Sequence, residues 1–69
     1  MNNFYSITSF KNQDGIYEIH PCNNDTISGY IQVKDCVYYD FVTKEKISEK
    51  DLWEIESFEE ENLVYYVKL

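Results

Sequence analysis

Three side chains in this sequence are of the types that bind transition metals or act in nucleophilic catalysis: His20, Cys22 and Cys36. A structural zinc site takes four such ligands and a catalytic site takes three plus water, so this scattered set is a weak signal. His20 and Cys22 are two residues apart, so on a strand they share a face and their side chains lie about 6–7 Å apart. This distance is too long for a hydrogen bond between a thiolate and an imidazole. We therefore expect no catalytic residue, no cofactor and no metal. A metal-binding protein that uses these three residues is the weaker alternative.

The acidic tract between residues 51 and 61 points to a second chemistry, recognition by charge. Its carboxylates are interleaved with the large apolar side chains of Trp53, Ile55 and Phe58. Carboxylates steer a protein toward a basic surface, and an exposed aromatic ring anchors the contact. The predicted partner-binding residues are the acids and two rings of this tract, with one tyrosine from the preceding hairpin: Asp51, Trp53, Glu54, Glu56, Phe58, Glu59, Glu60, Glu61 and Tyr38. In the competing interpretation, the rings belong to the core and the acids only keep neighbouring strands soluble.

Paired tyrosines suggest a second surface. Consecutive residues of a strand point to opposite faces of the sheet. One ring of the pair Tyr38 and Tyr39 must therefore face away from the core, and so must one ring of the pair Tyr65 and Tyr66. If Tyr30, Tyr38 and one ring of the second pair share the outer face, they form an aromatic patch suited to protein contact or homodimerisation. The alternative is that a second layer of structure covers these rings.

Length, charge and composition narrow the class of partner. The chain has 69 residues, which we interpret as a single acidic β-rich domain over 1–69, and its formal net charge is −7 with no Arg. Residues 1–34 carry a net charge of −1, and residues 35–69 carry −6. This balance repels nucleic acid and anionic membranes, and the lack of Arg removes bidentate contacts with phosphates and bases. We expect a protein partner with a basic surface, and neither direct nucleic-acid contact nor membrane binding.

The sequence also bears on location. The start, MNNFYSITSF, lacks the basic residues and apolar stretch of a signal peptide, and no later segment has the apolar length of a spanning helix. We therefore expect a cytoplasmic protein in which both cysteines are free thiols.

In size, charge and A/T-rich coding composition, the chain is similar to the small inhibitors of phages and other mobile elements, which act by binding host enzymes. Together with the acidic tract, this similarity implies a non-enzymatic protein-binding module, an inhibitor that engages a basic, nucleic-acid-binding protein surface. Its carboxylates would then mimic the phosphates of nucleic acid. The alternative is a small structural or homodimeric domain with no partner for its acidic face.

Strand-like runs must position these residues. The run at 4–11, FYSITSFK, alternates as a strand does, and NQDG at 12–15 is a turn signal. The run at 16–22, IYEIHPC, is the expected returning strand, which Pro21 ends or places at an edge. A polar loop over 23–29 lets the next strand pair back on this one.

The stretch YIQVKDCVYYDFVT, residues 30–43, predicts a hairpin around which the other elements are organised. A three-residue loop over 34–36 makes Val33 face Val37 and places every aliphatic on one side of the sheet. A two-residue loop at 34–35 separates these side chains between the two faces. Matching the apolar set therefore favours the longer loop.

Ser48 followed by Asp51 resembles a capping box and predicts one short helical segment near residues 49–57. The same residues also fit a strand, so the sequence alone leaves both a helix and a strand possible for this segment. Residues 59–62 would form a connection, and the apolar run at 63–69 is the expected last strand, in a central or covered position. The predicted fold class is mainly β (β or α+β): a small antiparallel sheet of about five strands, as a meander or an open barrel, with one short helical segment.

Overall fold

A computed structural model describes residues 3–22 and 26–69 of the chain. These residues form an antiparallel sheet of five strands in the order β1-β5-β2-β3-β4, together with a 3₁₀ helix and an α-helix. The elements are β1 (Asn3–Phe4), η1 (Ile7–Phe10), β2 (Gly15–Pro21), β3 (Gly29–Lys34), β4 (Val37–Asp40), α1 (Glu49–Asn62) and β5 (Val64–Lys68). The predicted class, mainly β or α+β with a small antiparallel sheet, is confirmed, and the sheet is open.

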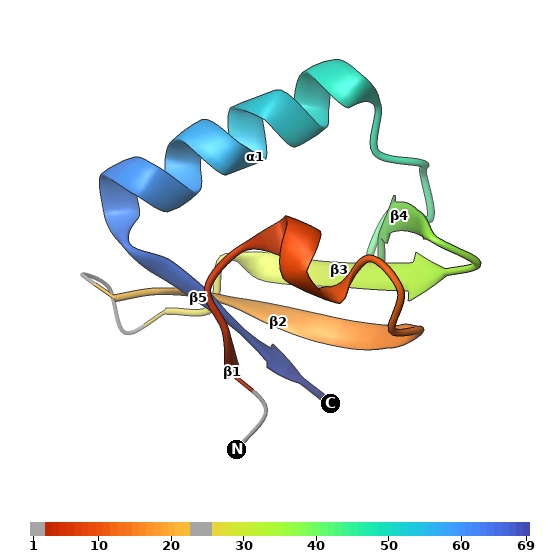
Figure 1. Cartoon of the computed structure of the whole chain (residues 1–69), viewed down its shortest axis with the longest axis horizontal. Helices are drawn as coiled ribbons and strands as arrows, with labels where there is room; N and C mark the ends of the chain where they lie inside the picture. The colour runs from red at the N-terminus through yellow and green to blue at the C-terminus, as the bar shows by residue number, and fades with distance from the viewer. Residues whose placement is uncertain (1–2, 23–25) are drawn as a thin grey trace.

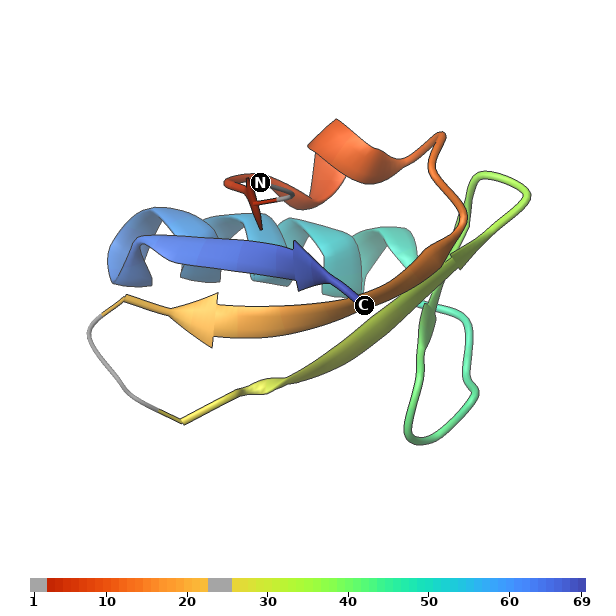
Figure 2. The ribbon, with the colours of Figure 1, turned by 90° about the horizontal axis from the view of Figure 1, so that it is seen from below.

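Both helices lie on one side of the sheet (Figure 1). Seen from below, β5 lies in front of α1, η1 stands clear of the strands at the top of the view, and no described element crosses the near side of the sheet (Figure 2). We call the side that carries the helices the inner face and the opposite side the outer face. The fold therefore has two layers, with one face of the sheet left uncovered.

The core lies between the inner face and η1, and aromatic rings fill much of it. The Phe10 ring of η1 stacks on Tyr17 with centroids 3.9 Å apart and meets Tyr66 edge-on at 5.1 Å. Rings of this size each remove about 150–250 Å² from water, which compensates for the small core of a short chain. The buried side chains of this core cluster are Ile7, Phe10, Tyr17, Ile31, Val33, Tyr38, Val64 and Tyr66.

The prediction of a strand over 4–11 is wrong, because only Asn3–Phe4 pairs in the sheet and Ile7–Phe10 is a 3₁₀ helix. Ser6 begins this helix: its Oγ accepts a hydrogen bond from the Thr8 amide, and its carbonyl accepts one from Ser9 at 3.0 Å. Residues three apart lie on the same side of a 3₁₀ helix, so Ile7 and Phe10 enter the core together. Alternation along a strand would have placed them on opposite faces.

The central hairpin exists, but the predicted loop is wrong. Lys34 pairs with Val37, so the loop has two residues, Asp35 and Cys36, both with positive φ (52° and 65°). This left-handed pair matches the twist of the flanking strands. Because Val33 then faces Tyr38, it is Tyr38 and not Val37 that joins the core.

The helix was predicted near 49–57 and continues to Asn62, so the expected connection over 59–62 is its last turn. Leu63 ends the helix in the left-handed conformation (φ 50°) and donates its backbone N–H to the Glu59 carbonyl. Asn62 donates from its side chain to the Phe58 carbonyl at 3.1 Å. These bonds satisfy carbonyls that the end of a helix leaves open, and they hold the last turn despite its adjacent acids.

Other predictions are confirmed. β3 pairs back on β2, β5 lies in the sheet between β1 and β2, and Pro21 is the last residue of β2. The prediction that the turn over 12–15 joins two strands is wrong, because this segment links η1 to β2. Residues 23–25 of the predicted 23–29 loop lie outside the described residues.

Candidate protein-binding helix

The start of α1 follows the predicted capping pattern. Ser48 is the N-cap, and its Oγ accepts a hydrogen bond from the Asp51 amide at 3.2 Å. Glu49 and Asp51 stand in the first turn, where negative charge is favourable next to the positive end of the helix dipole. The residues predicted to bind a partner therefore lie on a helix, apart from Tyr38.

The inner side of α1 contacts the fold through few side chains. None of its residues is fully buried, and Leu52 and Ile55 are half-buried against the core. Glu59 also turns inward: its Oε2 accepts hydrogen bonds from the Ile7 amide at 2.8 Å and from the Tyr66 hydroxyl. One carboxylate thus ties α1 to η1 and to β5.

Burial and the nearby acids Glu56 and Glu59 raise the pKa values of two tyrosines that lie beneath α1. Burial first, and then the hydrogen bond to Glu59, raise the pKa of Tyr66 well above its usual range. Burial, followed by the charges of Glu56 and Glu59, raises the pKa of Tyr38 to about 12. Both phenols therefore stay protonated at neutral pH and act as donors, with Tyr38 bonding the Ile7 carbonyl at 2.7 Å.

This position corrects the expectation for Tyr38. It was predicted to lie on the outer face and to contact a partner, but its side chain is only 6% exposed and lies in the core. The outer face instead carries Tyr39, because the two-residue turn shifts the register of β4 against β3.

The solvent side of α1 carries most of the charge of the protein. Its residues Asp51, Glu54, Glu60 and Glu61 are exposed, and the Trp53 side chain is 68% exposed. The helix has seven acids and one Lys, so it accounts for six of the seven net negative charges in the chain. The sheet and loops together are nearly neutral.

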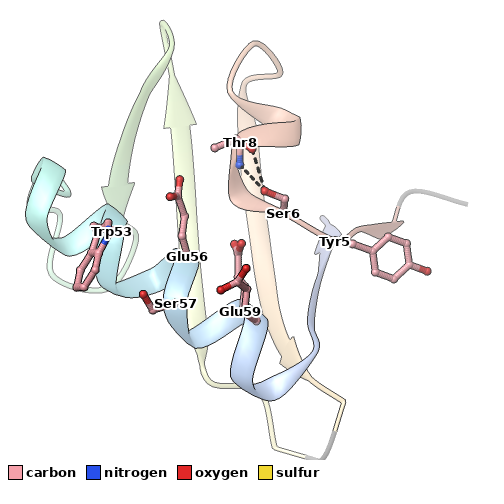
Figure 3. Close-up of a pocket in the computed structure, with 8 residues that line it drawn as sticks. Tyr5, Ser6, Thr8, Trp53, Glu56, Ser57 and Glu59 are labelled. Atoms are coloured by element: carbon pink, nitrogen blue, oxygen red, sulfur yellow. Dashed lines mark hydrogen bonds between the residues drawn. The ribbon is translucent and has the colours of Figure 1, made fainter.

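A first open groove beside α1 lies toward η1, and we call it the η1 groove. It has a volume of about 560 Å³. Figure 3 shows Glu56 and Glu59 reaching from α1 toward Ser6 and Thr8, while Tyr5 points away from the helix. The groove is lined by Tyr5, Ser6, Thr8, Trp53, Glu56, Ser57, Glu59 and Glu60. Its lining of carboxylates and hydroxyls suits a cationic side chain.

A second groove, which we call the β2 groove, lies on the other flank of α1 and has a volume of about 460 Å³. It is lined by Ile19, Ser28, Asp51, Glu54, Ile55, Phe58 and Tyr66. Trp53 and Phe58, the two predicted anchors, are five residues apart and so point about 140° apart around the helix. The structure therefore separates them, Trp53 beside the η1 groove and the 40% exposed Phe58 beside the β2 groove.

The three potential metal ligands are not brought together. Cys22 follows the Pro21 end of β2, whereas the Cys36 thiol donates to Asn12 beside the opposite end of that strand. His20 lies on the outer face, 3.0 Å from Glu18 and stacked on Tyr65. Over residues 3–22 and 26–69, no three His, Cys, Asp or Glu side chains cluster as metal ligands would, and both cysteines are exposed free thiols.

No protein-family model matches this chain, and no curated protein or solved structure is significantly similar to it. Within the described part of the chain, no helix combines the length and the apolar character needed to cross a membrane.

Proposed function

We propose that this protein is a non-enzymatic binding module that engages a basic surface on another protein through the solvent side of α1. One observation carries the proposal: six of the seven net charges lie on a single helix that buries none of its own residues and presents Trp53 to solvent. Such a surface attracts a basic partner at long range, and the indole ring supplies apolar contact area once the partner has docked.

The end of α1 supports the same proposal. Glu60 and Glu61 are exposed in the last turn, where no basic residue offsets the negative end of the helix dipole. Acids in this position cost a few tenths of a kcal/mol each. The hydrogen bonds from Ile7 and Tyr66 offset this free-energy cost for Glu59. Neither bond involves Glu60 or Glu61. A basic partner would turn this repulsion into attraction.

The partner we favour is a nucleic-acid-binding protein. Its binding surface is built for a row of phosphates, and the exposed carboxylates of α1 would offer it negative charge in their place. The protein would then act as an inhibitor in the cytoplasm, where its exposed thiols stay reduced. The small inhibitors of phages and other mobile elements, to which it is similar in size and charge, likewise act by binding host enzymes.

The test is retention of a partner from lysate by two variants of equal charge. Glu60→Gln with Glu61→Gln removes two exposed acids from α1, and Asp35→Asn with Glu45→Gln removes two exposed acids elsewhere. We expect the α1 variant to lose most of the retained basic protein, and the control variant to keep it. Retention by wild type should fall steeply as salt rises. Equal retention by both variants, independent of salt, would show that the acids only solubilise the protein.

A further inference from the structure

The outer face of the sheet is a second surface, distinct from α1. Directly paired residues of an antiparallel sheet share a face, and the pairs Glu18 with Tyr30, His20 with Tyr65 and Gln32 with Tyr39 extend across four strands. All six of these side chains are half-buried, although no described element crosses this side of the sheet (Figure 2). We call these six residues the outer tyrosine face.

Several of its rings are already held by their neighbours. The His20 ring stacks on Tyr65 at 4.9 Å with an interplanar angle of 19°, and its Nε2 lies 3.0 Å from Glu18. Tyr30 meets Phe41 edge-on at 6.4 Å. Side chains that are ordered before docking lose little rotamer entropy on binding, and tyrosine is enriched in protein interfaces.

Charge decides what kind of molecule this surface fits. The acids of α1 lie behind the sheet, whereas the outer tyrosine face carries one carboxylate, Glu18, and is bordered by two cations, Lys34 on β3 and Lys44 beside Tyr39. A strongly basic partner would find no attraction here. A two-fold-related copy can place unlike charges opposite each other.

The position of α1 also keeps the electrostatic repulsion between two copies of this acidic protein small. If two sheets pack face to face, about 10 Å apart, the two acidic helices lie on opposite outer sides, more than about 20 Å from each other. This separation exceeds the Debye length of about 8 Å at physiological salt, so the repulsion between helices is largely screened.

The available area matches a weak dimer. The molecule measures 30 × 28 × 20 Å, and the view onto the outer face spans its longest and shortest axes. The whole outline of this view covers about 600 Å², so face-to-face packing could bury at most about 600 Å² from each copy and about 1,200 Å² in total, the lower limit for a specific interface. We propose that the outer tyrosine face is a homodimer interface, with two sheets packed face to face and α1 exposed on both outer sides.

The test is sedimentation of wild type and matched variants over the micromolar range. Tyr65→Lys places a charge in the proposed interface, and Tyr5→Lys makes the same change at a 71% exposed tyrosine on the helix side. We expect the wild-type mass to double with concentration, Tyr65→Lys to weaken the dimer at least about tenfold, and Tyr5→Lys to leave it unchanged.

Two further readouts keep the test decisive. If Tyr65→Lys fails to fold, Gln32→Lys replaces it on the same face. On dilution, amide chemical shifts should change in β2, β3 and β5 and not in the solvent side of α1. A wild type that is monomeric at every concentration would overturn the proposal, and so would a dimer that Tyr65→Lys leaves intact.

Discussion

Glu59 lies in the acidic tract but is bonded inside the fold. It was predicted as one of three equivalent acids, yet its carboxylate is the acceptor for the Ile7 amide and the Tyr66 hydroxyl. Nothing in the sequence marks it apart from Glu60 and Glu61, because its partners are seven and 52 residues away. Variants that remove all three acids together would therefore confuse folding with binding.

Glu59→Ala should destabilise the protein, because the Ile7 amide and the Tyr66 hydroxyl lose a charged acceptor. Bonds to charged groups contribute about 1.5–3 kcal/mol, so we expect a loss of about 2–3 kcal/mol in the free energy of unfolding. Glu60→Ala, one residue further along the helix and exposed, should change this free energy by less than about 0.5 kcal/mol. Urea unfolding measures both. Equal effects of the two substitutions would contradict the role assigned to Glu59.

The buried tyrosines make a prediction about alkaline pH. Burial raises the pKa of Tyr38 to about 12, and that of Tyr66 further still, from an ordinary value of 10.0. Below pH 10 both rings are neutral in the folded and unfolded states, so stability is unaffected. As pH rises from 10 toward 12, only the unfolded state loses these protons, and the free energy of unfolding must fall.

Absorbance of the tyrosinate ion, recorded with unfolding at each pH, checks this. Tyr38 and Tyr66, whose pKa values burial raises, should titrate only as the protein unfolds. Tyr38→Phe should remove part of the alkaline loss of stability. Titration of Tyr38 and Tyr66 near pH 10 in the folded protein would contradict the buried hydroxyl network.

At the scale of elements, the tight turn of Asp35 and Cys36 sets which tyrosine enters the core. Neither residue is Gly, although both hold positive φ, a conformation that favours Asn and Gly in two-residue hairpins. Asp35→Asn with Cys36→Gly should therefore stabilise the protein by about 0.5–1 kcal/mol, despite the loss of the Cys36 bond to Asn12.

The matched control moves the same dipeptide back by one residue. Lys34→Asn with Asp35→Gly should destabilise the protein, because Lys34 is the last residue of β3 and pairs with Val37. Thermal unfolding of the two variants compares the registers directly. A greater stability of the Lys34 variant would contradict the register described here.

The elements that were predictable are those with strong local signals. Ser48 and Asp51 marked the helix start, Pro21 marked the end of β2, and apolar runs marked β3 and β5. η1 was missed because Ser6 and Thr8 alternate with apolar residues as they would in a strand. The full length of α1 was missed because its last turn depends on Glu59 and Leu63, whose contacts and conformation the local sequence does not display.

Over the whole molecule, charge and aromatic surface are separated onto opposite sides. α1 carries six of the seven net charges on one side of the sheet, and the outer tyrosine face is on the other. The uneven charge along the chain, −1 over residues 1–34 and −6 over residues 35–69, reflects this helix rather than a charged half of the fold. A partner on α1 and a second copy on the sheet would therefore not compete for the same surface.

Site-specific photocrosslinking tests the central claim, that α1 binds a basic protein, most directly. A photoreactive residue replaces either Trp53 on α1 or Val42, which is 72% exposed in the loop after β4. In lysate, position 53 should form an adduct with a basic protein, with a yield that falls as salt rises, and position 42 should form none. An adduct at position 42 but not at 53, or a yield at 53 that salt does not change, would contradict the account.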